Sequence, residues 1–83
     1  MSRRRAVIAG TGSALPRTRV SNAELAQRVD TSDEWITERT GIKFRHIAEA
    51  DETTATLGAD AARKALEAAG IEANDIDLIV LAT

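Results

Sequence analysis

Two short apolar runs lie near the ends of the chain, with helical patterns between them. Ala6–Ala9 and Asp77–Thr83 are nearly continuous in apolar residues, as expected of strands that are buried on both faces. The longest helical pattern follows a cap at Thr53 or Thr54 and ends at Ala69. A strand, helices and a second apolar strand predict a βαβ crossover with parallel strands, which places the chain in the α/β class.

Small residues recur at spacings of three and four along the longest predicted helix. This pattern predicts a stripe on which a sheet or another helix could sit closely. The residues of the stripe are Ala55, Gly58, Ala62, Ala65 and Ala69. On the exposed side, Asp60 and Lys64 are four positions apart, in the order that favours an ion pair.

Two shorter helices are predicted from their capping residues. Ser21, with Glu24 three positions later, matches a capping box, and the helix that follows is expected to reach Val29. Ser32 is the N-terminal cap of the second helix. Gly41 stands just past the last turn of that helix, where a glycine cap is common.

The connecting segments carry no complete ligand motif. Ile42–Ile47 alternates apolar and basic residues, which predicts an extended segment, with an edge strand as one option. Gly10–Ser13 predicts a tight turn, since a dinucleotide loop would need a third glycine where Leu15 stands. Glu49–Glu52 predicts a solvated acidic loop, because its spacing does not match a calcium loop. His46 is the only histidine, and without a neighbouring nucleophile we expect a structural or surface role for it.

The composition is that of an ordinary soluble globular protein with an aliphatic core. Of 83 residues, 43% are apolar and 29% are charged, and only Trp35 and Phe44 are aromatic. The net charge is −2 and the only basic run is Arg3–Arg5, which argues against a nucleic-acid-binding face. The chain has no cysteine, so thiolate metal sites and a cysteine nucleophile are excluded from these residues, and no metal site is expected. No apolar run approaches the roughly 18 residues of a membrane span, and a cytoplasmic location is expected.

The apolar strand predicted at Asp77–Thr83 indicates that these residues are part of something larger. A parallel strand this apolar is normally buried on both faces, and no further segment is present to cover the second face or to pair with the outer edge. The length suffices for one small domain only. We therefore expect residues 1–83 to be an incomplete part of a domain, and to be poorly soluble or partly ordered by themselves.

Trp35 and Arg39 lie one turn apart on the second predicted helix, and their spacing allows two interpretations. The indole could stack on an aromatic base while the guanidinium reaches a phosphate or covers the ring face. Alternatively, the tryptophan packs the helix down and the arginine is solvated. Spacing alone favours packing.

Three motifs in this region resemble a known family. They are Asp30–Ile36, Arg39–Ile42 and Arg45–Ile47, and together they strongly resemble β-ketoacyl-acyl-carrier-protein synthase III, which starts bacterial type II fatty-acid synthesis. The resemblance extends over nearly the whole chain from Val7. Further matches are Gly10–Ser13, Leu15, Pro16, Asn22, Ala68, Gly70, Ile71 and Asp77–Thr83.

The resemblance implies a thiolase-like fold of two similar halves in a homodimer, in which residues 1–83 form the opening βαβ portion of the N-terminal half. In the family, the tryptophan that matches Trp35 stacks on the adenine of coenzyme A, opposite an arginine from a later segment. The residues that match Arg39 and Thr31 also contact the nucleotide end. The resemblance therefore favours the stacking interpretation of Trp35 and assigns coenzyme A binding to Trp35, Arg39 and Thr31.

The implied reaction is a decarboxylative Claisen condensation of an acyl-CoA primer with malonyl-acyl-carrier protein. The family's catalytic cysteine, histidine and asparagine have no counterpart in this chain, so no catalytic residue is assigned and the 83 residues are expected to be inactive alone. The coenzyme A thioester is a substrate, and no separate cofactor is expected. Two alternatives remain: a starter-unit synthase or acyltransferase of secondary metabolism with the same fold, or a small non-catalytic interaction module.

Overall fold

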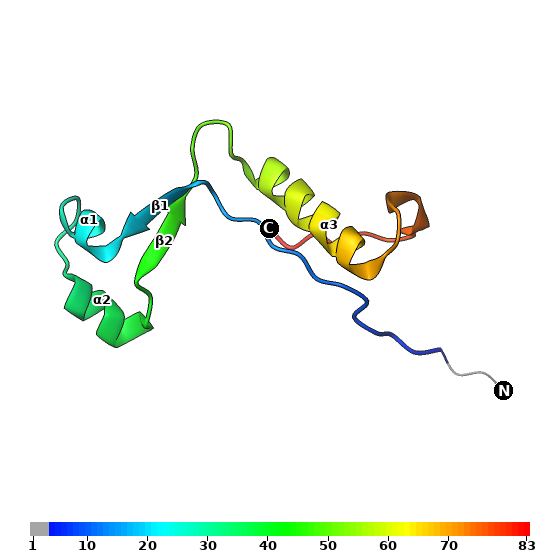
Figure 1. Cartoon of the computed structure of the whole chain (residues 1–83), viewed down its shortest axis with the longest axis horizontal. Helices are drawn as coiled ribbons and strands as arrows, with labels where there is room; N and C mark the ends of the chain where they lie inside the picture. The colour runs from blue at the N-terminus through cyan, green and yellow to red at the C-terminus, as the bar shows by residue number, and fades with distance from the viewer. Residues whose placement is uncertain (1–3) are drawn as a thin grey trace. The chain divides into compact units, whose positions relative to one another are not determined.

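The computed structural model describes residues 4–83, so Arg3 of the predicted basic run lies outside the described residues. The chain divides into two units, which are shown in Figure 1. One unit is Leu15–Thr54, and the other joins the described part of Met1–Ala14 to Ala55–Thr83.

The unit Leu15–Thr54 contains a two-stranded antiparallel sheet (Figure 1). Strand β1 is Thr18–Ser21 and strand β2 is Phe44–Ile47, paired so that Thr18 lies opposite Ile47 and Ser21 opposite Phe44. The extended segment predicted at 42–47 is therefore confirmed, as a strand over its last four residues. Strand β1 was not predicted, because the caps that follow it dominate the local pattern.

Two short helices follow from the caps that the sequence predicts. Helix α1 is Asn22–Ala26, and the Ser21 hydroxyl accepts a hydrogen bond from the backbone N–H of Glu24 at 3.2 Å. The prediction that α1 reaches Val29 is wrong: the helix ends three residues earlier, and a turn follows in which the N–H groups of residues 28 and 29 share the carbonyl of Leu25.

Helix α2, Asp33–Thr40, has both of its predicted caps. The Ser32 hydroxyl accepts from the N–H of Trp35 at 3.1 Å. Gly41 has φ 71°, in the left-handed region, and its N–H donates to the carbonyl of Thr37 at 2.8 Å. Val20, Ile36 and Asn22 are the residues of this unit that are buried, so α2 reaches the core of the unit through Ile36.

Helix α3, Thr54–Ala69, is the main element of the other unit and has the predicted length. A short 3₁₀ helix, η1, follows at Ala73–Asp75. A Cβ atom added to Gly10 would lie 2.6 Å from the backbone nitrogen of Ala69 and 2.7 Å from the carbonyl oxygen of Ala65. The small-residue stripe therefore allows a close approach, as predicted. The segment that approaches it is the backbone around Gly10, rather than a sheet or another helix.

The ion pair predicted on α3 has a different partner. Asp60 pairs with Arg63 at 3.0 Å, three positions away. Lys64 instead donates from Nζ to the backbone carbonyl of Ser13 at 3.2 Å, so it holds the N-terminal segment to α3. Both interactions are exposed and contribute little to stability.

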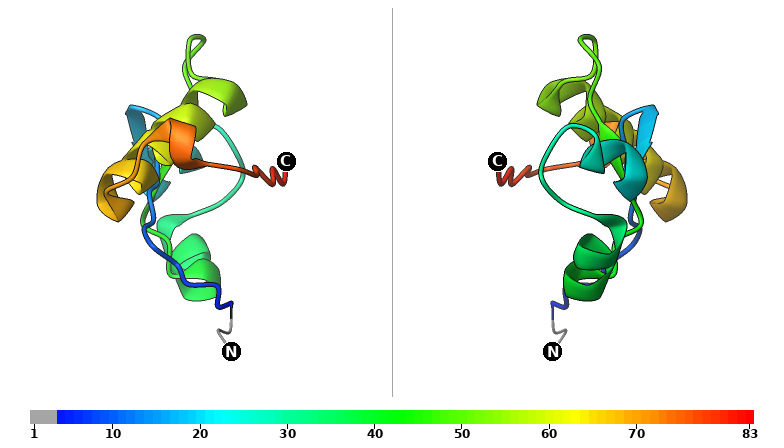
Figure 2. Two further views of the ribbon diagram at one scale, coloured as in Figure 1. Left: turned by 90° about the vertical axis from the view of Figure 1, so that its right-hand side faces the viewer. Right: turned by 90° about the vertical axis from the view of Figure 1, so that its left-hand side faces the viewer.

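The two segments predicted as parallel strands, Ala6–Ala9 and Asp77–Thr83, are not strands in this chain. Figure 2 shows the C-terminal segment without helix or strand. A strand forms when its N–H and C=O groups bond to a neighbouring strand, and no strand among residues 4–83 lies beside either segment. The side chains of residues 78–81 are between 78% and 86% exposed.

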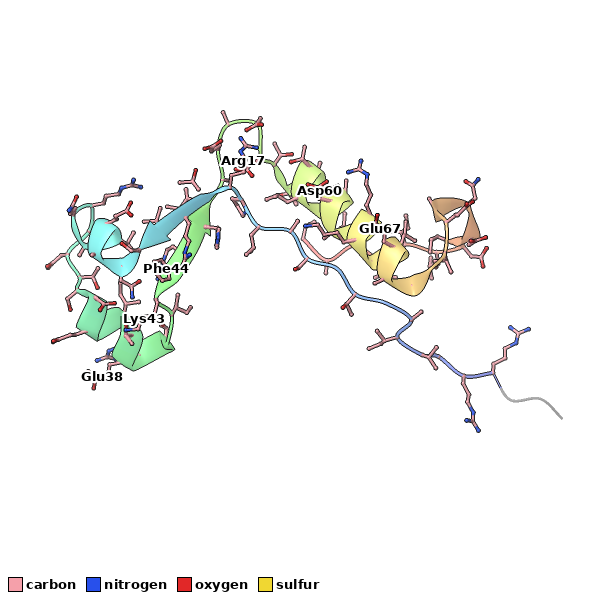
Figure 3. The ribbon with its side chains drawn as sticks, in the orientation of Figure 1. Arg17, Glu38, Lys43, Phe44, Asp60 and Glu67 are labelled. Atoms are coloured by element: carbon pink, nitrogen blue, oxygen red, sulfur yellow. The ribbon has the colours of Figure 1, made fainter. Side chains whose placement is uncertain are left out.

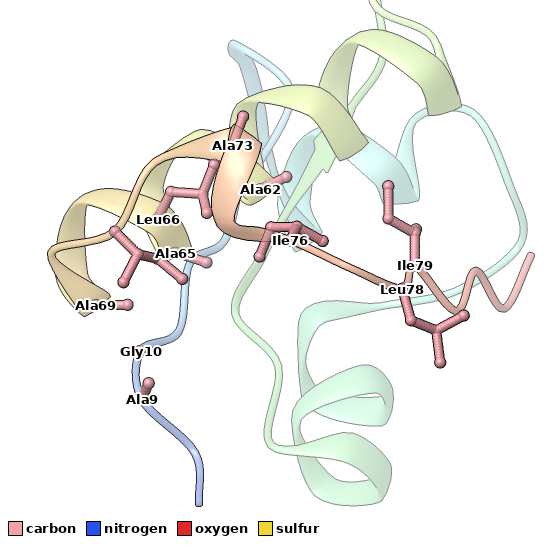
Figure 4. A pocket seen from close by; sticks show the side chains of 11 residues that line it. Ala9, Gly10, Ala62, Ala65, Leu66, Ala69, Ala73, Ile76, Leu78 and Ile79 are labelled. Atoms are coloured by element: carbon pink, nitrogen blue, oxygen red, sulfur yellow. The ribbon is translucent and has the colours of Figure 1, made fainter.

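An apolar groove of about 490 Å³ lies along α3 (Figure 4). Its lining includes Ala62, Ala65 and Ala69 of the small-residue stripe, and Ile76 and Ile79 after η1. The predicted stripe therefore forms one wall of the groove. Within residues 4–83, no helix is both long enough and apolar enough to cross a membrane.

Candidate functional site

The first turn of α2 and the loop before it surround a hollow of about 350 Å³. Asp30, Thr31, Ser32 and Trp35 line it. Two of the three predicted coenzyme A-binding residues, Thr31 and Trp35, therefore lie at one place. The Oγ1 atom of Thr31 is buried and has no hydrogen-bond partner among the described residues, so its hydrogen-bonding capacity is unused.

Trp35 is 53% exposed, so its indole does not pack the helix down. Ile36, the next residue, is buried and does that instead. The guanidinium carbon of Arg39 lies 4.8 Å from the centroid of the Trp35 ring, within the range of a cation–π contact. The structure thus brings the third predicted residue onto the same indole, and of the two interpretations of Trp35 it argues against packing.

On the face of α2 opposite Trp35 and Arg39, the Asp33 carboxylate accepts two hydrogen bonds. Asp33 Oδ1 accepts from Asn22 Nδ2 at 2.9 Å and from the Thr37 hydroxyl at 3.1 Å. The bond from Asn22, then the bond from Thr37, hold the pKa of Asp33 below its usual range, and the charge of Lys43 acts in the same direction. A negative carboxylate in the first turn also interacts favourably with the helix dipole.

An ionic cluster lies at the start of β1 (Figure 3). The Arg17 guanidinium bonds to the carboxylates of Glu49 and Asp51, the latter at 2.8 Å, and the Arg17 N–H donates to Glu52 at 3.0 Å. Hydrogen bonds from Thr18 and then Arg17 keep the pKa of Glu49 low, and the Arg17 bond does the same for Asp51. The predicted solvated acidic loop is therefore exposed at Glu49 and Asp51, which pair with Arg17, but not at Glu52, whose side chain is only 8% exposed. Among the described residues, no group of three or more acidic, histidine or cysteine side chains could hold a metal ion.

His46 lies on β2 opposite Arg19 and is exposed. This position agrees with the predicted surface role. Arg19 places its guanidinium 3.6 Å from the centroid of the Phe44 ring, so both aromatic rings of the chain are covered by an arginine.

The chain is closely similar to curated proteins with one name. It is 81% identical over 80 residues to the β-ketoacyl-[acyl-carrier-protein] synthase III of Sphingopyxis alaskensis, a match that covers 96% of this chain and 25% of the relative. It is 68% identical over 78 residues to the enzyme of that name from Neisseria meningitidis serogroup A, with 94% and 24% covered. The resemblance to β-ketoacyl-acyl-carrier-protein synthase III is confirmed. The chain spans about a quarter of the length of these synthase III relatives. No family model matches the chain.

Solved structures support the same fold. The priming β-ketosynthase from the R1128 polyketide biosynthetic pathway matches with a TM-score of 0.80 and 48% identity, over 84% of this chain and 21% of that one. The 3-oxoacyl-[acyl-carrier-protein] synthase III of Aquifex aeolicus matches with a TM-score of 0.70 and 50% identity, over 77% and 20%. The predicted fold class, a thiolase-like α/β fold of which this chain forms the opening portion, is thereby confirmed.

Asn22, for which the sequence predicted no site role, is 1% exposed and bonded to α2. Its partners are 11, 15 and 20 residues away in the chain, so no local pattern reveals them. Two signals were available, its place immediately after the cap at Ser21 and its match to the family that the chain resembles.

Proposed function

We propose that this chain supplies part of the coenzyme A site of a condensing enzyme similar to β-ketoacyl-acyl-carrier-protein synthase III. The single observation that supports this most strongly is the arrangement of Trp35, half exposed beside a hollow, with Arg39 over its ring. An indole ring has two faces. The guanidinium covers one of them, which leaves the other for a planar base such as adenine.

The polar groups around the indole suit the rest of a nucleotide. Arg39 carries a fixed positive charge with several donors, which suits a phosphate. Thr31 lines the same hollow, and its buried hydroxyl has no partner among the described residues. A hydroxyl that turned toward the hollow could donate to, or accept from, a base or ribose. Stacking, charge and an unpaired hydroxyl, supplied by α2 and the loop before it, explain why these three residues would act together.

The reaction we propose for the whole protein joins an acyl-CoA primer to malonyl-acyl-carrier protein by decarboxylative Claisen condensation. The names of the relatives, which are synthases acting on acyl-carrier protein, support this proposal. The chain itself would bind and orient the nucleotide end of the acyl-CoA. The acyl-accepting thiolate must be outside these residues, because they contain no cysteine. A cytoplasmic location and a homodimer are part of the same proposal.

The test is replacement of Trp35 in a chimaeric enzyme in which residues 1–83 replace the matching quarter of the Sphingopyxis alaskensis relative. Loss of a stacked base costs about 1–3 kcal/mol, so Trp35→Ala is expected to raise the KM for acyl-CoA by roughly 5- to 150-fold. The KM for malonyl-acyl-carrier protein is expected to stay the same. Trp35→Phe is the matched control, because it keeps a flat ring and should lose less. An unchanged KM for acyl-CoA in Trp35→Ala would refute the stacking role.

A second candidate function is priming of a polyketide chain. It is favoured by one observation, the likeness to the priming β-ketosynthase of the R1128 polyketide pathway. Both candidates use the same nucleotide end and differ in the acyl chain that they accept. Comparing kcat/KM for acetyl-CoA with that for longer or branched acyl-CoA primers in the full-length enzyme would separate them.

A further inference from the structure

Asn22 is the buried polar residue of the unit Leu15–Thr54. It lies where β1 ends and α1 begins, and its backbone N–H donates to the carbonyl of Lys43 at 3.2 Å. This bond continues the pairing of β1 with β2 by one residue. The backbone of Asn22 is therefore held by the sheet, and its side chain extends from this fixed backbone.

The side-chain amide of Asn22 bonds to α2 and to the segment that leaves it. Nδ2 donates to Asp33 Oδ1 at 2.9 Å and to the backbone carbonyl of Ile42 at 2.7 Å. A longer contact of 3.4 Å reaches the Thr37 hydroxyl. Both short bonds end on pure acceptors, so the amide cannot be reversed without placing oxygen against oxygen. One side chain thus holds the beginning and the exit of α2.

The face of α2 held in this way is opposite the face that carries the predicted site. Asp33 and Thr37 are four positions apart and share one face. Two positions along a helix correspond to a rotation of about 200°, so Trp35 and Arg39 project from the other face. Trp35 is half exposed and is not itself held by packing. Its position depends on how α2 packs in this unit, and buried Ile36 and the Asn22 bonds are among the contacts that hold α2 in place.

We propose that Asn22 is a positioning residue for the nucleotide site: by bonding Asp33 and the Ile42 carbonyl it fixes the orientation of α2, and hence where Trp35 and Arg39 stand beside the hollow that Thr31 also lines. This inference rests on the proposed function, since that placement matters only if the indole receives a base. Asn22 does not touch the ligand. Its effect would therefore be seen in affinity for the nucleotide, rather than in the chemical step.

The test uses the chimaeric enzyme described above, in which the rest of the site is present. We would titrate it with coenzyme A, with pantetheine as the ligand that lacks the nucleotide, and measure both dissociation constants by calorimetry. Asn22→Ala is expected to weaken coenzyme A binding about fivefold or more, the factor that corresponds to loss of a buried hydrogen-bond donor, and to leave pantetheine binding unchanged. Asn74→Ala is the matched control, since Asn74 is exposed on η1 in the other unit, and its dissociation constants should equal those of the unaltered chimaera.

A second readout separates positioning from general stability. In the chimaeric enzyme, Asn22→Ala is expected to raise the KM for acyl-CoA with kcat unchanged, because the nucleotide end takes no part in the chemical step. Asn74→Ala should change neither constant. A role for Asn22 in general stability alone would lower the melting temperature and the amount of active enzyme, and leave the KM for acyl-CoA unchanged.

The outcomes separate the two proposals. If the unaltered chimaera binds coenzyme A and Asn22→Ala binds it equally well with an unchanged KM for acyl-CoA, the positioning role is refuted and the proposed function stands. If the unaltered chimaera binds coenzyme A no more tightly than pantetheine, the nucleotide site is refuted, and the positioning role with it. If Asn22→Ala does not fold, Asp33→Ala removes the same bond from the exposed side, and Asp33→Asn restores an acceptor oxygen. Weaker binding in Asp33→Ala, rescued in Asp33→Asn, would support the proposal, and equal binding in both would overturn it.

Discussion

The two aromatic side chains lie at the surface, each beneath an arginine. Phe44 is 45% exposed and Trp35 somewhat more, while the buried apolar residues of the same unit are Val20 and Ile36. The aliphatic core expected from the composition is therefore confirmed in this unit. The caps at Ser21, Ser32 and Gly41 were predictable because each interaction spans four residues or fewer. The role of Asn22 was not predictable, because its partners come together only in the folded chain.

The Asp33 carboxylate gives the chain a specific pH dependence. Its pKa is lower in the folded chain than in an unfolded one, because Asn22 and Thr37 donate to the charged form. The stabilisation is therefore present above the unfolded pKa, and is lost as the pH falls through the folded value. Asp33→Asn is expected to lower the melting temperature near pH 7, and this difference should shrink progressively as the pH falls below about 4.

The measurement is the melting temperature of both chains by circular dichroism between pH 7 and pH 3. Glu49 and Asp51 also have lowered pKa values, so both chains should lose stability in acid, and only their difference reports on Asp33. A difference that stays constant down to pH 3 would contradict the assignment of this charge to the bond with Asn22.

At the scale of elements, helices were easier to predict than strands. Helix α3 ends where the sequence indicates, because a helix satisfies its backbone hydrogen bonds within itself. Strand β1 and the segments Ala6–Ala9 and Asp77–Thr83 depend on a partner, and the sequence around each does not reveal whether the partner is present. Strand β2 was anticipated from its alternation, while β1, its partner, was missed.

Two glycines provide a matched test of helix ends and helix interiors. Gly41 has φ 71°, which an alanine adopts only with strain, so Gly41→Ala is expected to cost about 1–2 kcal/mol in local stability of α2. Gly58 lies inside α3 with nothing within 4 Å of the position of a Cβ, so Gly58→Ala should stabilise α3 by about 1 kcal/mol. Hydrogen exchange of the α2 and α3 amides would measure both changes in local stability. Faster exchange of the α3 amides in Gly58→Ala would contradict the expected stabilisation of α3.

At the scale of the whole molecule, residues 78–81 present an exposed apolar run, and the groove along α3 adds further apolar surface. Contiguous apolar surface of this kind favours association. Exposed apolar surface here was expected, because no predicted segment covers the strand predicted at Asp77–Thr83. The absence of any strand at Asp77–Thr83 was not expected.

The 83-residue chain is therefore expected to self-associate in solution. Leu78→Lys combined with Val80→Lys should reduce the apparent mass seen by sedimentation, with unchanged helical content, because both side chains are exposed. Gln27→Lys combined with Asn74→Lys adds the same charge at exposed polar positions and should leave the association as it is. A monodisperse monomer in the unaltered chain, melting cooperatively, would contradict the expectation.

The pairing at the base of the unit Leu15–Thr54 has a consequence for evolution. The unit is entered through β1 and left through β2, which are hydrogen-bonded neighbours, and Arg17 bonds directly to Glu52. Entry and exit therefore lie side by side, which is the arrangement found where one module has been inserted into another. The piece that carries Trp35, Arg39 and Asn22 has the form of a cassette. Transplanting residues 15–54 between relatives would exchange the surface proposed to bind the nucleotide, because the segment enters and leaves at neighbouring positions.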